Sequence, residues 1–187
     1  SSSHLGRVCG LSSEVYAECG VLAGEIAGRQ IQGCMDKGVF CFFIRFAFNE
    51  HETRRSVSVD SSWLTEQALR EIYLRPFELA VKEGKTRAVM SSFNRIGATW
   101  AGASKALLTD LLRTEWGFVG SVITDMYDGN ADWMSEEQGL FAGQDTWLSV
   151  PFGGSPGLSD EALASPTIQK YMRLACEHIT NTLAQAT

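Results

Sequence analysis

The sequence lacks several features that mark whole classes of protein. It has no apolar run of about 18 residues, so we expect no membrane-spanning helix. Its most basic short run is only Arg54-Arg55 and the formal net charge is -6, which argues against nucleic acid as a partner because phosphates require basic patches. Only three histidines occur, and none has metal-ligand spacing. We therefore expect no bound metal and no cofactor.

The cysteine pattern gives no sign of a fold held together by disulfide bonds. The five cysteines are odd in number and scattered, with no Cys-x-x-Cys pair. Buried, reduced thiols fit this pattern better than a disulfide framework. The chain begins Ser1-Ser2-Ser3-His4, which does not resemble a secretory leader. Together these observations favour a cytoplasmic location, as an expectation.

What the sequence does contain is an alternation of two apolar patterns. Hydrophobic residues make up 44% of the chain and charged residues 20%, as in an ordinary globular domain. Short apolar runs predict buried strands at residues 39–48, 87–93, 120–124 and 146–150. Amphipathic spacing predicts helices at residues 13–32, 64–82, 104–116, 135–142 and 165–184, with Pro76 bending the second. We see no internal boundary, so residues 1–187 are interpreted as one domain.

This order predicts an α/β fold: one helix followed by about four parallel β–α units with right-handed crossovers. Four units are half of a (β/α)₈ barrel, which typically needs about 250 residues. An open four-stranded parallel sheet leaves two edges and an uncovered face. The prediction is therefore a half-barrel that is completed by a missing barrel half or by another copy of the chain.

One carboxylate stands out at the predicted strand ends, where parallel α/β folds place their chemistry. Asp125 directly follows the predicted strand at residues 120–124. Its position alone leaves two interpretations open, a catalytic group or a helix-capping and turn aspartate. Trp100, in a predicted loop after the second strand, is a candidate substrate-binding residue, because an aromatic face can stack on the apolar C–H face of a ligand.

The sequence contains four motif blocks, at residues 46–55, 68–81, 89–94 and 108–125, which in this chain order resemble glycoside hydrolase family three. The most specific is residues 108–125, LTDLLRTEWGFVGSVITD, which is similar to the family pattern that ends at its nucleophilic aspartate. Residues 68–81, ALREIYLRPFELAV, and residues 89–94, VMSSFN, resemble two further blocks. Residues 46–55, FAFNEHETRR, resemble a fourth. The resemblance covers nearly the whole chain and corresponds to the C-terminal half of the family's barrel domain.

The resemblance implies a retaining β-glycosidase of the β-glucosidase or β-xylosidase type, acting on a β-linked oligosaccharide or glycoside. Asp125 would be its nucleophile, with the acid/base carboxyl supplied from elsewhere. Substrate contacts would come from positions that match the family's sugar-binding motifs, namely Arg7, Arg45, Phe93 and Met126.

An alternative remains open from the same comparison. The family's Lys-His pair is Ile44-Arg45 here, its Ser-Asp-Trp motif is Thr124-Asp125-Met126, and a tyrosine is Phe93. These differences motivate a second hypothesis, a catalytically inactive barrel fragment or subunit that binds sugar or assembles with a partner.

Overall fold

A single parallel sheet organises the chain. The computed structural model describes residues 14–50, 61–127, 133–150 and 157–185. Four parallel strands pair in the order β1-β3-β6-β7. Their bounds are β1 Phe42–Phe46, β3 Ala88–Ser91, β6 Ser121–Tyr127 and β7 Thr146–Ser149. The predicted α/β fold class, with parallel strands joined through helices, is confirmed.

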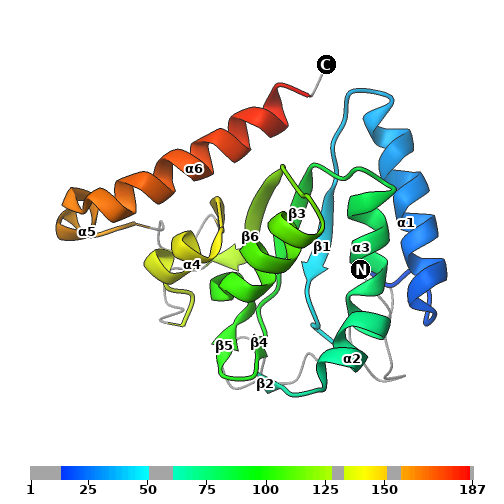
Figure 1. The fold of residues 1–187 in the computed structure, drawn as a ribbon. Helices are drawn as coiled ribbons and strands as arrows, with labels where there is room; N and C mark the ends of the chain where they lie inside the picture. Colours follow the sequence, from blue (N-terminus) through cyan, green and yellow to red (C-terminus); the bar gives the residue numbers. More distant parts are fainter. Residues whose placement is uncertain (1–13, 51–60, 128–132, 151–156, 186–187) are drawn as a thin grey trace.

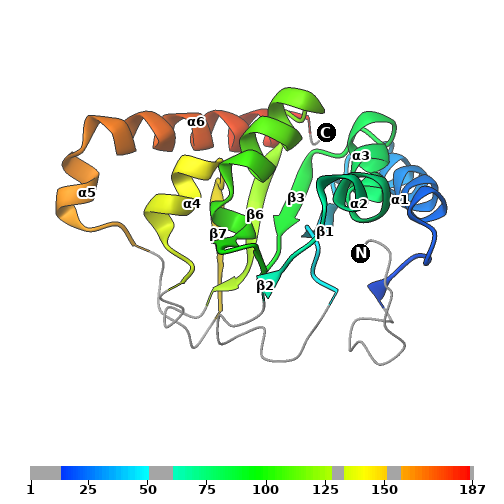
Figure 2. The same cartoon turned by 60° about the horizontal axis from the view of Figure 1, so that its bottom comes forward.

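Helices lie along one face of this sheet, as Figures 1 and 2 show. In chain order they are α1 Gly20–Met35, α2 Glu66–Ala68, α3 Arg75–Lys82, α4 Glu136–Ala142, α5 Asp160–Ala164 and α6 Pro166–Leu183, with the π-helix η5 Ala106–Glu115 between β3 and β6. The ends of α4 agree with the sequence: Ser135 Oγ accepts from Gln138 N, and Gly143 adopts a φ of 107° that favours glycine. None of the helices in the described ranges has the length and apolarity needed to cross a membrane.

The two faces of the sheet differ in burial. Val89 and Val122 are 1% and 0% exposed and belong to the main core cluster, packed with residues of the covering helices such as Phe77, Leu108 and Leu112. Met90 and Ile123, which pair across β3 and β6, are only partly buried. Because alternate strand residues point to opposite faces, the core lies between sheet and helices while the other face is less covered.

The second helical segment departs from the predicted single bent helix at residues 64–82. Instead α2 is followed by a π-helical turn, η3 Leu69–Tyr73, and a new helix, α3, begins at Arg75. Pro76 occupies the first turn of α3, where a missing N–H costs nothing. The proline therefore starts a helix rather than bending one.

Two small features were not predicted. Residues Ser61–Ser62, Arg95–Ile96 and Thr99–Trp100 form a three-stranded sheet, β2-β4-β5, in which β4 and β5 are an antiparallel hairpin. Gly97 has a φ of 60° in the turn of this hairpin. The short helix α5 precedes α6. Strands of two residues carry too little apolar periodicity to be recognised from sequence.

Candidate functional site

Asp125 lies inside strand β6 rather than directly after it. Strand β6 continues to Tyr127 because Met126 and Tyr127 pair with Leu148 and Ser149 of β7, after an irregularity in the register. The prediction that the strand ends at residue 124 was therefore wrong by three residues. Asp125 is 5% exposed, so its carboxylate is buried near the carboxyl ends of the parallel strands.

Both oxygens of the Asp125 carboxylate accept hydrogen bonds. Arg45 Nε donates to Oδ2 at 2.7 Å, and the backbone N–H of Met126 donates to Oδ1 at 2.9 Å. Arg45 reaches Asp125 from β1, across β3. These two bonds, one to each oxygen, orient the carboxylate.

Arg45 also links Asp125 to a second acidic residue. Its Nη1 lies 3.0 Å from Oε2 of Glu14, which precedes α1. The side chains of Arg45 and Asp125 are 12% and 6% exposed, whereas that of Glu14 is 38% exposed. The sequence placed Arg45 and Asp125 at one site but did not reveal that they touch, and it gave no role to Glu14. Opposite charges 80 positions apart were the only available signal.

Polar groups surround the ends of β1 and β3. The carbonyl of Ala47 accepts from Ser92 Oγ at 3.0 Å and from Asn94 Nδ2 at 3.2 Å, which joins the two strand ends. Asn49 is 6% exposed, and neither its side-chain nitrogen nor its oxygen has a hydrogen-bond partner among the described residues. Such atoms normally find a partner, so Asn49 is a candidate for binding an external polar group. The sequence signal was a polar residue at the end of an apolar run.

The other predicted binding residues are distributed differently. Phe93 and Trp100 are 8% and 3% exposed and belong to an aromatic cluster with Tyr127. The Trp100 indole donates to Ser92 O at 2.9 Å, so its ring serves the core and is not available as a sugar platform in this chain. Met126 is 51% exposed beside Asp125. Arg7 lies outside the described residues.

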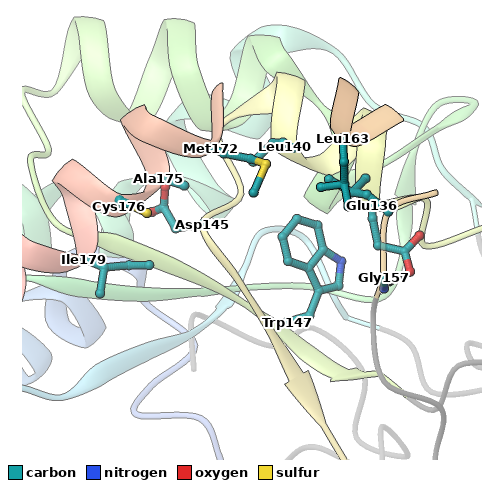
Figure 3. Close-up of a pocket in the computed structure, with 11 residues that line it drawn as sticks. Glu136, Leu140, Asp145, Trp147, Gly157, Leu163, Met172, Ala175, Cys176 and Ile179 are labelled. Atoms are coloured by element: carbon teal, nitrogen blue, oxygen red, sulfur yellow. Dashed lines mark hydrogen bonds between the residues drawn. The ribbon is translucent and has the colours of Figure 1, made fainter. Parts of the chain in front are cut away.

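An apolar cavity of about 300 Å³ lies elsewhere, between β7, α4, α5 and α6 (Figure 3). Trp147 projects into it, with Leu140, Met172 and Ala175 among the other lining residues. Asp125 does not line this cavity. Across residues 14–50, 61–127, 133–150 and 157–185, no group of three or more His, Cys, Asp or Glu side chains is arranged to hold a metal ion.

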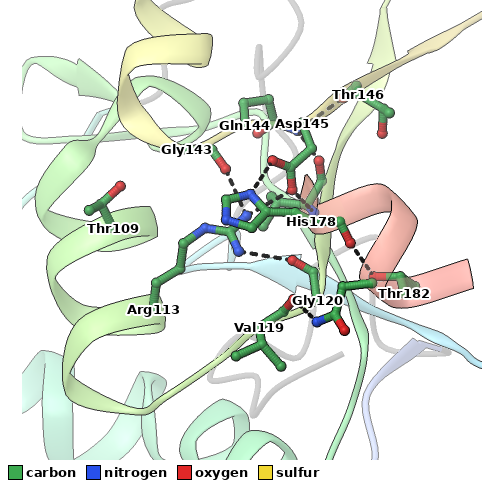
Figure 4. Close-up of polar contacts among 12 residues, drawn as sticks. Thr109, Arg113, Val119, Gly120, Gly143, Gln144, Asp145, Thr146, His178 and Thr182 are labelled. Carbon is green, nitrogen blue, oxygen red and sulfur yellow. Dashed lines mark hydrogen bonds and ion pairs between the residues drawn. The ribbon is translucent and has the colours of Figure 1, made fainter. Parts of the chain in front are cut away.

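A second buried carboxylate, Asp145, stands before β7 at the opposite ends of the strands (Figure 4). Its Oδ2 accepts from Arg113 Nη2 and from Val122 N, both at 2.7 Å, and its Oδ1 lies 2.8 Å from His178 Nδ1. Burial lowers the pKa of Arg113, and the Asp145 carboxylate opposes that shift. This network joins η5, β6, β7 and α6. In a barrel fold, that end of the strands serves stability.

Comparison with known proteins places the chain among glycosyl hydrolases. The model of the glycosyl hydrolase family 3 N-terminal domain matches residues 6–149. A probable β-glucosidase I from Aspergillus clavatus is 43% identical over 118 residues, which cover 63% of this chain and 14% of that protein. β-Glucosidase B from Emericella nidulans is 39% identical over 148 residues, covering 79% of this chain and 17% of that protein.

Solved structures are similar over almost the whole chain. β-Glucosidase 3B from Thermotoga neapolitana, in complex with glucose, superposes with a TM-score of 0.87 at 33% sequence identity. The match covers 99% of this chain and 26% of that one. The chain thus spans at most about a quarter of the length of these relatives.

Proposed function

Because this chain belongs to glycosyl hydrolase family 3, we propose that it forms part of a retaining β-glucosidase in which Asp125 is the nucleophile. The observation that carries the proposal is the Asp125 carboxylate, buried at the strand ends and oriented through both oxygens. A helix-capping role is disfavoured, because Asp125 lies within β6. The names of the relatives, β-glucosidases from fungi and bacteria, support β-glucosides as the substrate class.

The proposed reaction has two steps. In the first, an Asp125 oxygen attacks the anomeric carbon, the glycosidic bond breaks, and the leaving oxygen takes a proton from a second carboxyl group. In the second, water attacks the same carbon, the bond to Asp125 breaks, and the second carboxylate takes the water proton. Retention requires the two carboxyl groups about 5–5.5 Å apart. We propose that the second carboxyl comes from a part of the enzyme outside this chain.

Sugar hydroxyls would be bound by residues beside Asp125. The unsatisfied amide of Asn49 offers one donor and one acceptor group, and the exposed Met126 offers an apolar contact. Arg7 remains a predicted contact from its motif. Arg45, predicted to bind substrate, directs two nitrogens at carboxylates, which points to a different role for it. Phe93 remains a proposed substrate contact at the edge of the aromatic cluster, and Trp100 is left out of the proposed site.

We also propose that residues 1–187 form one unit, the second half of the barrel domain. Strands β1 and β7 are the edges of the four-stranded sheet among the described residues, and each would pair with a strand supplied from outside. The much greater length of the relatives favours further polypeptide as the source, with another copy of the chain as the alternative.

Hydrolysis of 4-nitrophenyl β-glucoside by the complete polypeptide that carries this chain tests the proposal. We expect Asp125→Asn to abolish turnover, because an amide cannot form the covalent intermediate, while Asp110→Asn on the exposed face of η5 should leave it unchanged. Proton NMR of the first product should show the β-anomer. Full activity in Asp125→Asn, or an α-anomer as first product, would refute the assignment.

A second candidate function is a non-catalytic subunit that binds sugar. The observation that favours it is the Arg45 guanidinium bound directly to Asp125, since it neutralises the proposed nucleophile. Glucose binding by calorimetry that survives Asp125→Asn, without turnover in the unmodified protein, would select this alternative.

A further inference from the structure

The contact between Arg45 and Asp125 affects the relative rates of the two chemical steps. The two side chains are 12% and 6% exposed, so their interaction is weakly screened by water. A hydrogen bond between buried charged groups is stronger than one between neutral groups. Whatever changes the charge on Asp125 during the reaction must therefore change the strength of this contact.

We propose that Arg45 is a positioning residue that favours breakdown of the glycosyl-enzyme over its formation. This inference rests on the proposed role of Asp125 as nucleophile. Arg45 stabilises the free carboxylate, which is negatively charged, much more than the glycosyl ester, which is neutral. An ester oxygen also accepts a hydrogen bond less strongly than a carboxylate oxygen.

The charge on Asp125 moves in opposite directions in the two steps. When Asp125 attacks, an electron pair on its oxygen forms the new bond to the anomeric carbon, and the bond to the aglycone breaks. Arg45 loses interaction energy in that step. When water attacks, the bond to Asp125 breaks and the electron pair returns to the carboxylate, so Arg45 regains it. Only differences between ground and transition states affect a rate, so Arg45 slows formation and speeds breakdown.

The geometry suits an arginine rather than another cation. Arg45 uses Nε for Asp125 and Nη1 for Glu14, so one planar group spans two carboxylates. A lysine would keep the charge but not this fork. The charge of Glu14, whose Oε2 lies 3.0 Å from Nη1, attracts the guanidinium and helps to hold it beside Asp125.

Pre-steady-state kinetics of the complete polypeptide with an activated aryl β-glucoside test the proposal. Wild-type enzyme should release nitrophenol without a burst. In Arg45→Gln, breakdown becomes slower than formation, so a burst should appear. We expect breakdown to slow by roughly three- to tenfold, which lowers kcat, because about half of a charge-assisted hydrogen bond is present in each transition state. Faster formation and slower breakdown both lower KM, so KM should fall further than kcat and the ratio kcat/KM should rise.

Three variants make the interpretation specific. Arg45→Met is a second neutral replacement, used in case Arg45→Gln does not fold, and it should behave in the same way. Arg45→Lys keeps the positive charge, so its burst should be smaller than that of the neutral variants and its KM closer to the wild-type value. Arg70→Gln is the matched control, since Arg70 also bridges two carboxylates, Glu66 and Glu115, on the exposed surface, and it should change nothing.

The failure of this inference differs from the failure of the proposed function. If the wild-type protein turns over through Asp125 but the neutral variants lower kcat/KM with KM unchanged or raised and without a burst, Arg45 acts only structurally and the inference is overturned. If wild-type enzyme turns over without glycosylation of Asp125, or does not turn over, the proposed function fails and this inference fails with it.

Discussion

Replacing Asp145 by asparagine should destabilise the protein more than any surface charge change. The Asp145 side chain is 1% exposed and accepts from Arg113 and from the backbone N–H of Val122, both at 2.7 Å. The variant keeps the shape of the side chain but removes its charge. It leaves the Arg113 guanidinium, 11% exposed, without a charged partner in the network.

The expected cost follows from that burial. Breaking a buried ion pair by removing one partner costs about 3–5 kcal/mol. We expect about 3 kcal/mol for Asp145→Asn, because Arg113 retains hydrogen bonds to the carbonyls of Gly120 and Gly143. Urea denaturation monitored by tryptophan fluorescence measures the free energy of unfolding.

A surface control variant and a double-mutant cycle complete the test. Asp110→Asn removes an exposed ion pair with Lys105 and should cost below about 1 kcal/mol. Combining Asp145→Asn with Arg113→Met should cost less than the sum of the two single changes, because neither charge is then left alone. A cost below about 1 kcal/mol for Asp145→Asn, or strict additivity, would refute the reasoning.

Two further predictions use matched pairs of residues. Gly120→Ala would place its new carbon 2.0 Å from the carbonyl oxygen of Arg87, so we expect the free energy of unfolding to fall by at least about 1–3 kcal/mol. Gly33→Ala, in the exposed part of α1, should raise it by about 1 kcal/mol, and thermal denaturation distinguishes the two variants. Trp100→Phe removes the hydrogen bond to the buried carbonyl of Ser92, whereas the indole nitrogen of Trp147 has no partner among the described residues. In urea denaturation, Trp100→Phe should therefore lower the free energy of unfolding by about 1–3 kcal/mol more than Trp147→Phe. Equal losses in the two variants would contradict this.

Strong local patterns were sufficient to predict the main elements of the fold. The apolar runs around Val89 and Val122 are buried on the helix side. The capping residues of α4, Ser135 and Gly143, are those that the sequence predicts. The π-helical turn before α3 was not, because the stripe of apolar residues continues across it and only Pro76 marks the change. The β2-β4-β5 sheet depends on pairing between distant segments, for which two-residue strands give no signal.

The site was predictable only where a residue's role depends on position along a strand. The position of Asp125 beside a buried strand left a catalytic or a capping role open, and the resemblance of residues 108–125 to the family pattern made it the candidate nucleophile. The direct contact of Arg45 with Asp125 depends on how β1 and β6 flank β3, and that register is not encoded locally. Trp100 is predicted to lie in a loop, but it lies in β5 and is 3% exposed, and its indole N–H donates to the carbonyl of Ser92.

Asp125 is the residue proposed to form the covalent bond to the sugar. The most direct measurement is mass spectrometry of peptides from the complete polypeptide after inactivation with a 2-deoxy-2-fluoro-β-glucoside, which slows breakdown of the intermediate. We predict one added fluoroglucosyl group on the peptide that carries Asp125, absent in Asp125→Asn. A label on any other carboxylate, or continued turnover by the treated protein without a label, would contradict the account.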